Sequence, residues 1–242
     1  NFFPVGDKWM LLCISHPLGC RYYLGDWDAE AEQFVPETMQ RMTWPWEGGD
    51  PDNRFSRALF APESVLTPDG RRVMWAWMPE INDTLRHKTL QCLPRELILA
   101  DDGSLRIRPL RELESHRYDP VVIEDFTVES PDRMNGGFAR KRVAELNGDA
   151  FEIRVTVPRA EADRKYFGVR LFAGEDRQGL PINIQPANGT LRVGTAEAPF
   201  AVADLPPGED VELRIFIDKY LVEVFVNGRQ TLVAADMDYT QA

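Results

Sequence analysis

The clearest structural signal in this sequence is Val211-Glu212-Leu213-Arg214-Ile215-Phe216-Ile217, where apolar residues alternate with mostly charged ones. An alternation of period two predicts an antiparallel strand with one face in a core and the other in water. A second strand is predicted at Leu221–Val226, after the link Asp218-Lys219. Asn227-Gly228 then gives one of the strongest short signals for a hairpin, because both residues accept the positive φ of a tight turn. With a last strand near Thr231–Ala234, this end of the chain predicts an antiparallel sheet.

The same pattern of short strands and turn signals covers nearly the whole chain. The clearest turn signals upstream are Pro17-Leu18-Gly19, Pro68-Asp69-Gly70 and Asp101-Asp102-Gly103. Strands are predicted near Lys8–Ser15, Arg21–Trp27, Leu59–Leu66, Arg71–Met78, Arg95–Ala100, Ser104–Pro109, Val121–Val128, Ala150–Val157, Tyr166–Ala173, Ile182–Gln185 and Leu191–Thr195. Helical spacing of apolar residues is hard to find. The fold class is therefore predicted to be all-β.

The chain is expected to divide into two parts, 1–112 and 121–242, joined by a linker at 113–120. A charged stretch at Glu112–Arg117, where a short helix is one option, ends at Asp119-Pro120, which breaks any helix. A four-stranded propeller blade takes about 40 to 50 residues, so the first part is long enough for about two blades and cannot close a ring. About eight short strands in the second part predict a β-sandwich.

Composition and charge limit the classes of partner. With 242 residues, of which 43% are hydrophobic and 28% charged, the chain can bury one large core or two smaller ones. Its net charge of −11 argues against a nucleic acid or an anionic membrane as a partner, because both bind through clustered Lys and Arg. A neutral substrate such as a sugar suits this surface better. No apolar run in the sequence approaches the roughly 18 to 20 residues that cross a bilayer.

The cysteines and histidines predict no cofactor and no metal site. Cys13, Cys20 and Cys92 show no paired spacing such as Cys-x2-Cys, so we interpret them as small buried hydrophobic residues. The histidines lack spaced partners for a metal or a catalytic triad. We expect loop or linker positions for His16, His87 and His116.

Three stretches of this sequence resemble one family of enzymes. They are Asn1-Phe2-Phe3-Pro4 with the following Gly6-Asp7-Lys8-Trp9, Arg71–Trp77 followed by Leu93–Leu97, and Leu213–Gly228. The resemblance is to the fructan-cleaving glycoside hydrolases of family 32: invertases, levanases, inulinases and related β-fructofuranosidases. It implies a five-bladed β-propeller, of which residues 1–112 are the last two blades or so, followed by a β-sandwich. The implied substrate is a fructose-containing oligo- or polysaccharide of the sucrose, inulin or levan type.

The resemblance also implies where the chemistry lies. In this family an Asp within Asn-Asp-Pro-Asn is the nucleophile, an Arg-Asp-Pro segment stabilises the transition state, and the Glu of a Glu-Cys pair is the general acid. None of these motifs occurs in the sequence, and the match of Asn1–Trp9 implies that the Glu-Cys pair carrying the general acid lies directly before Asn1. We therefore expect the chain to contain no catalytic residue, to be inactive alone, and to have the upstream propeller blades of the same protein as its partner.

What the resemblance leaves in this chain is part of a substrate-binding wall. Trp77 matches a tryptophan that lines the fructosyl pocket, and Trp44 offers a second flat aromatic face for sugar C–H groups. Phe60 and Glu63 lie in a segment similar to the family's Phe-Tyr-Ala-Pro-Gln strand. Thr43 stands where the family commonly has an Asp, so it keeps hydrogen bonding and gives up the charge. This departure leaves room for a fructosyltransferase or a changed linkage preference.

From the residues alone, Glu63 and Glu96 are the carboxylates in the most apolar strand surroundings. Glu96 is interpreted as half of a buried structural ion pair, since Arg95 and further arginines are near in sequence. For Glu63 a position facing a cleft and a solvent-facing or hydrogen-bonded position both stay open. Trp75 is interpreted as a core residue.

A second function from a different class is a carbohydrate-binding or adhesion module that holds glycan without cleaving it. Two unclosed blades would leave exposed strand edges in such an independent module, which is an aggregation hazard. The hydrolase is therefore the favoured prediction.

Overall fold

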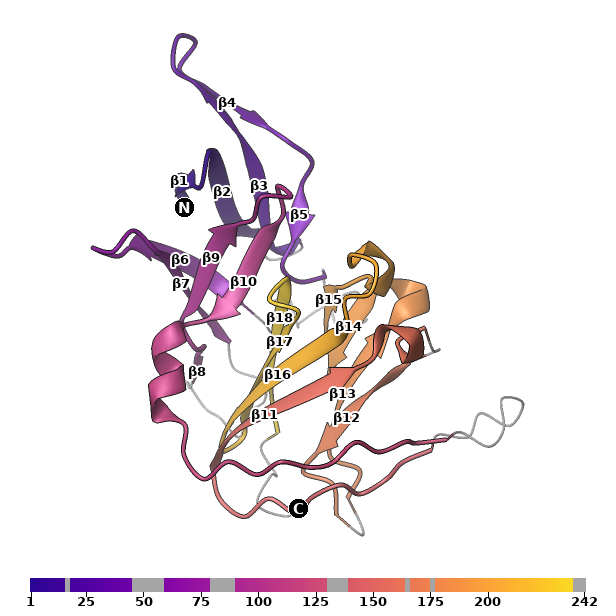
Figure 1. Ribbon diagram of the computed structural model, residues 1–242. Helices are drawn as coiled ribbons and strands as arrows, with labels where there is room; N and C mark the ends of the chain where they lie inside the picture. Colours follow the sequence, from indigo (N-terminus) through magenta and orange to yellow (C-terminus); the bar gives the residue numbers. More distant parts are fainter. Residues whose placement is uncertain are drawn as a thin grey trace.

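The computed structural model describes residues 1–15, 18–44, 59–78, 90–129, 139–163, 166–174 and 177–236. Within these ranges the regular structure consists of β-strands and short 3-10 helices, arranged in four antiparallel sheets (Figure 1). The predicted all-β class is confirmed. We call the two sheets formed before residue 110 the blade sheets and the two sheets formed after residue 149 the sandwich sheets.

The first blade sheet is an antiparallel meander whose strands follow chain order. It consists of β1 (Phe2–Val5), β2 (Lys8–Ser15), β3 (Gly19–Asp28) and β4 (Gln33–Pro36), with β5 (Gln40–Arg41) paired to β3. The second blade sheet consists of β6 (Phe60–Leu66), β7 (Arg72–Met78), β9 (Arg95–Leu99) and β10 (Leu105–Pro109), with β8 (Leu90–Gln91) paired to β7. Four-stranded meanders of this kind are the repeating unit of β-propellers.

Turn chemistry and alternation explain these strands. Gly70 and Gly103 take φ angles of +83° and +75° in the predicted hairpin turns, a conformation that costs glycine little. Along β2 the side chains of Met10 and Leu12 are fully buried, while their neighbours in sequence point to the opposite face. Because β6 contacts β2 and β3, the buried face of the first blade sheet packs against the second.

The sandwich sheets are two further four-stranded antiparallel sheets whose buried residues belong to one core. One consists of β11 (Ala150–Val157), β16 (Val211–Asp218), β17 (Leu221–Val226) and β18 (Gln230–Ala235). The other consists of β12 (Phe167–Leu171), β13 (Leu180–Gln185), β14 (Thr190–Val193) and β15 (Ala196–Pro199). On β16, Val211, Leu213 and Ile215 are completely buried, as their alternation predicted. Short 3-10 helices connect some strands: η3 (Arg159–Glu161), η4 (Pro186–Asn188) and η5 (Val202–Asp204).

One predicted strand is wrong. Residues 121–128 form no strand, and Val121 and Val122 are 85% and 89% exposed. Figure 1 shows this segment and residues 139–149 as extended backbone that passes outside the sheets. An apolar β-branched run predicts a strand only if a neighbouring strand pairs with it, and the sequence does not supply that information. The charged stretch before it does form a short helix, the 3-10 helix η2 (Arg111–His116).

A buried ion pair joins the blade sheets to the sandwich sheets. Arg95 on β9 and Glu223 on β17 lie 2.7 Å apart with side chains that are 0% and 1% exposed. Glu223 also accepts the backbone N–H of Leu93, and Arg95 donates to Thr231 Oγ1 at 3.2 Å. Burial raises the pKa of Glu223, while the adjacent guanidinium favours the charged carboxylate. These contacts fix β9 against β17, so the position of the second blade sheet depends on the sandwich sheets.

Candidate functional site

The site begins where the first strands of the two blade sheets meet. In each blade sheet the first strand along the chain, β1 or β6, lies at one edge of the meander. The amide of Asn1 donates to a carboxylate oxygen of Glu63, and Ser64 Oγ donates to Asn1 Oδ1 at 2.9 Å. Glu63 is exposed and hydrogen-bonded, which was one of its two predicted positions. The start of β1 is therefore fixed directly beside β6.

Phe60 and Trp77 form an aromatic pair at the start of β6. They are opposite each other in the β6–β7 ladder, and their rings are 4.9 Å apart at an interplanar angle of 85°. Leu59 and Ala61 take positive φ angles of 55° and 42°, and the register shifts between Phe60 and Glu63. This bulge re-aims the side chains at the end of the strand. Both rings are half-buried, so each keeps some surface for a ligand.

Thr43 and Trp44 occupy different surroundings from this aromatic pair. Thr43 is 1% exposed, and its Oγ1 accepts a hydrogen bond from the backbone N–H of Cys20 at 3.2 Å. Trp44 is 37% exposed, and its backbone N–H donates to Glu197 O at 2.9 Å. The structure thus brings Phe60 and Trp77 together, places Thr43 inside the first blade sheet, and places Trp44 beside strand β15.

Glu96 and Trp75 were both interpreted as structural residues, and the structure confirms this interpretation only for Glu96. Glu96 is 5% exposed, and its Oε1 lies 3.0 Å from Arg71 Nη1 and 3.1 Å from Arg111 Nε. Burial acts to raise the pKa of Glu96, but the hydrogen bonds from both arginines outweigh it and hold this pKa below its usual value. The predicted ion pair of Glu96 is confirmed, although Glu96 pairs with Arg71 and Arg111 rather than with Arg95. The core interpretation of Trp75 is wrong, because Met74, Ala76 and Met78 are the β7 residues in the core cluster, whereas Trp75 is only partly buried and lies on the same strand face as Trp77.

The cysteines occupy ordinary structural positions. Cys20 and Cys92 are 0% and 1% exposed, and Cys13 is half-buried. Burial raises the pKa of both buried thiols to about 12, so they stay protonated and unreactive. Of the histidines, His116 lies at the end of η2, and the other two fall outside the described residues. Across the described ranges, no group of three His, Cys, Asp or Glu side chains is arranged to hold a metal ion.

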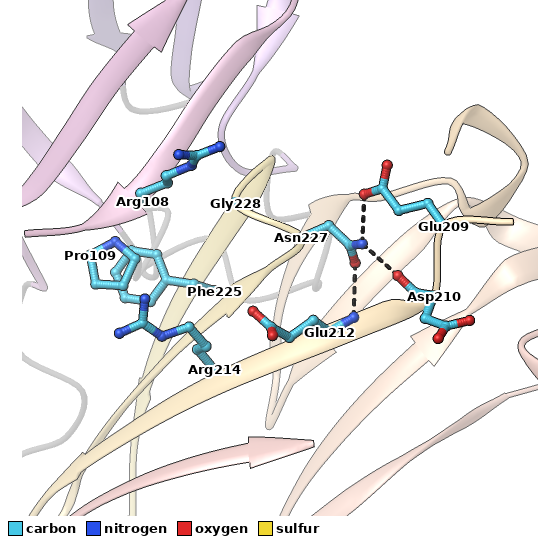
Figure 2. Close-up of a pocket in the computed structure, with 9 residues that line it drawn as sticks. All are labelled: Arg108, Pro109, Glu209, Asp210, Glu212, Arg214, Phe225, Asn227 and Gly228. Atoms are coloured by element: carbon cyan, nitrogen blue, oxygen red, sulfur yellow. Dashed lines mark hydrogen bonds between the residues drawn. The ribbon is translucent and has the colours of Figure 1, made fainter. Parts of the chain in front are cut away.

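A cavity of about 440 Å³ lies elsewhere, between β10 and the β16–β17 hairpin. Asn227 Nδ2 donates to Glu209 Oε1 at 2.9 Å and to Asp210 O at 2.7 Å, and its Oδ1 accepts the N–H of Glu212 at 3.2 Å (Figure 2). The polar groups around Asn227 in this cavity are therefore largely hydrogen-bonded to one another. None of the predicted site residues lines this cavity, and we do not place the chemistry there.

Each half of the chain matches a domain of one enzyme family. The four antiparallel sheets define an all-β protein with a propeller-like arrangement of strands. The sequence model of the glycosyl hydrolases family 32 N-terminal domain matches residues 3–109, and that of the glycosyl hydrolases family 32 C-terminal domain matches residues 112–235. The chain belongs to glycosyl hydrolase family 32.

The individual proteins similar to this chain are consistent with this family assignment. Sucrose-6-phosphate hydrolase of Escherichia coli is 30% identical over 97% of this chain and 48% of its own length. Raffinose invertase of Escherichia coli is 31% identical over 78% of this chain and 38% of its own length. The structure of fructan 1-exohydrolase IIa from Cichorium intybus with 1-kestose superposes with a TM-score of 0.66, 16% identity, and coverage of 96% of this chain and 52% of that one. The chain spans about half or less of the curated relatives that it matches. Over the described ranges, no helix is long and apolar enough to cross a membrane.

Proposed function

We propose that this chain is the downstream part of a retaining glycoside hydrolase that acts on β-fructofuranosidic bonds. Residues 1–112 supply the last two blades of a five-bladed propeller, residues 113–120 form a linker, and residues 121–242 form a β-sandwich. The nucleophile and the general acid precede Asn1. The ranges of the two matching domain models, which meet between residues 109 and 112, support this division.

One observation carries the proposal: the first blade sheet is apolar on both faces. Its second face bears Phe2, whose ring stacks on Trp9 at 4.9 Å and lies 5.9 Å from Trp27 and 5.1 Å from Phe34. Phe2 and Trp27 are nevertheless 41% and 40% exposed. A sheet with two apolar faces is normally covered on both, and an exposed aromatic cluster marks a contact surface. A preceding blade would cover this face.

The hydrogen bonds of Asn1 indicate where a catalytic carboxyl group upstream of Asn1 would lie. Because Asn1 is fixed against Glu63 and Ser64, a carboxyl group just before Asn1 would lie at the same end of the blade sheets. The Phe60–Trp77 pair then offers apolar ring surface for the C–H groups of a fructosyl unit. We assign Trp77, Phe60, Trp44 and Glu63 to the substrate wall. Thr43 supports this wall from inside the first blade sheet, because its Oγ1 accepts a hydrogen bond from the backbone N–H of Cys20.

The substrate in this proposal is a fructose-containing oligo- or polysaccharide. Relatives of this chain are named for sucrose 6-phosphate and raffinose, and the similar structure holds 1-kestose. A retaining reaction requires two carboxyl groups about 5 to 5.5 Å apart across the scissile bond, and upstream sequence supplies both. A carbohydrate-binding or adhesion module is not favoured, because the matching domain models come from hydrolases.

The test is an activity screen of the complete gene product against sucrose, inulin and levan. We expect fructose release with retained anomeric configuration, followed by NMR. The isolated 242-residue chain should release none. A Glu→Gln change at the glutamate of the Glu-Cys pair expected just before Asn1 should abolish turnover and leave substrate binding intact. Fructose release by the isolated chain at the rate of the complete protein would contradict the proposal.

A further inference from the structure

Two extended segments outside the sheets expose a large apolar surface. We call residues 121–129 the outgoing arm and residues 139–147 the returning arm, and neither forms a ladder with a described strand. Seven of their apolar residues are 43% to 89% exposed: Val121, Val122, Ile123, Phe126, Val128, Val143 and Leu146. At roughly 100 Å² each, these residues expose on the order of 700 Å², and a standard protein interface buries about 800 Å² from each partner. An exposed apolar surface of this size marks an interaction site.

The two arms lie side by side and carry opposite charges. Lys141 Nζ lies 5.3 Å from the centre of the Phe126 ring, so the arms are in contact. The outgoing arm has three acidic residues and no basic one, whereas the returning arm has three basic residues and one acidic one. They are Glu124, Asp125 and Glu129 on the first arm, and Arg140, Lys141, Arg142 and Glu145 on the second. Such a surface is self-complementary, because a two-fold axis can place the acidic arm of each copy against the basic arm of the other.

The arms adjoin the side of the sandwich where the core is least covered. β11 and β12 are the end strands of their sheets, so each has an edge that pairs with no described strand. Ile153 on β11 packs against the core but is only half-buried, whereas its partner Ile215 on β16 is completely buried. Burial and, after it, the positive charge of Arg140 lower the pKa of Arg170 on β12, so the returning arm runs beside that strand. The apolar surface of the arms therefore continues to two free strand edges.

We propose that the two arms and the outer edge of β11, together called the arm surface, bind a second copy of the protein across a two-fold axis. A second copy matches the arm surface in charge and in area, and free strand edges readily pair with strands of another chain. Figure 1 shows the arms on the far side of the sandwich sheets from the labelled N-terminus, so a preceding blade at Asn1 does not cover them. The dimer goes beyond the proposed function, because the arm surface includes no residue of the substrate wall.

The test reverses the charge of one arm at a time in the complete gene product. Glu124→Lys with Asp125→Lys makes both arms basic, and Lys141→Glu with Arg142→Glu makes both arms acidic. We expect the unaltered protein to sediment as a dimer and each variant alone to have a dissociation constant raised by about tenfold or more, because like charges then face each other. An equimolar mixture of the two variants should form dimers again. Charges that pair only within one chain would give no such recovery.

Two further variants show whether the effect belongs to the arm surface. Glu30→Lys with Glu32→Lys is the matched control, because it makes the same charge change at exposed positions of the β3–β4 turn and should leave the dimer intact. Val122→Asp changes a residue that is 89% exposed, so it should weaken the dimer while circular dichroism and kcat/KM stay unchanged. This variant also decides the question if a charge variant fails to fold. A monomeric unaltered protein, a mixture that stays monomeric, or a Val122→Asp dimer of unchanged stability would each overturn the proposal.

Discussion

Replacing Glu223 with glutamine leaves a buried guanidinium without its counter-charge. Arg95 is completely buried, and Glu223 Oε2 at 2.7 Å is its only carboxylate contact in the described structure. Removing one member of a buried ion pair typically costs about 3 to 5 kcal/mol, because the remaining charge stays desolvated. Arg95 keeps neutral acceptors in Leu93 O and Thr231 Oγ1, so we expect the lower end, about 3 kcal/mol. This is roughly a hundredfold increase in the unfolding constant.

The assay is urea unfolding of the complete gene product followed by tryptophan fluorescence and far-UV circular dichroism. All six tryptophans of this chain lie in residues 1–112, so the fluorescence that this chain contributes reports the blade sheets, while circular dichroism also reports the sandwich sheets. Glu212→Gln is the matched control, because the 3.7 Å pair of Glu212 with Arg154 has both side chains about half exposed and should contribute less than about 0.5 kcal/mol. The double variant Arg95→Met with Glu223→Leu should be neutral or stabilising. A loss in Glu223→Gln no larger than that of Glu212→Gln would refute the reasoning.

Three further predictions concern the site and its support. Trp77→Ala in the complete protein should raise KM for the fructoside with little change in melting temperature, because Trp77 is half-exposed; a large fall in melting temperature at unchanged KM would make it a core residue. Glu96→Gln should cost about 2 kcal/mol at neutral pH, because it loses charge-assisted bonds to Arg71 and Arg111. The folded-state pKa of Glu96 is lowered, so its stabilisation is present above the ordinary pKa of about 4.3 and is lost as pH falls through the lower folded value. The stability difference between the two proteins, measured by urea unfolding, should therefore shrink from pH 5 to pH 3, and a difference independent of pH would count against this ion pair. Gly25→Ala should destabilise the first blade sheet strongly, because an added Cβ would lie 2.2 Å from Val35 O, and equal melting temperatures for it and the unaltered protein would contradict that packing.

Local signals in the sequence account for much of the fold. The alternation at Val211–Ile217 and the Asn227-Gly228 hairpin correctly predicted β16, β17 and the turn after them. The strand expected at residues 121–128 has the same kind of composition, yet it lacks a partner strand in the structure. Short strands such as β4 and β15, at Gln33–Pro36 and Ala196–Pro199, were missed because four residues are too few to show a periodicity. Local composition therefore predicted the longer strands, and pairing between strands decided the rest.

Only the features of the candidate site that lie within a single strand could be predicted from the sequence. The strands that contain Phe60 and Trp77 were predicted, and a role for these residues in substrate binding stays a prediction. The bulge at Leu59 and Ala61 that re-aims the strand has no signal in non-glycine residues. The burial of Thr43 depends on its bond to Cys20, which a sequence does not display. Arg95 and Glu223 are 128 residues apart, so only the folded chain reveals their pairing. Contacts of this range follow from tertiary structure, which local patterns do not determine.

The central claim is that the aromatic surface of these blades and a carboxylate upstream of Asn1 belong to one sugar-binding site. The most direct measurement is the position of fructose in a crystal structure of the complete gene product, with that carboxylate changed to its amide to stop turnover. The account predicts a fructosyl unit in van der Waals contact with the ring of Trp77 and beside the amide. A fructosyl unit bound instead in the cavity between Arg108 and Asn227, with Trp77 covered by other residues, would contradict it.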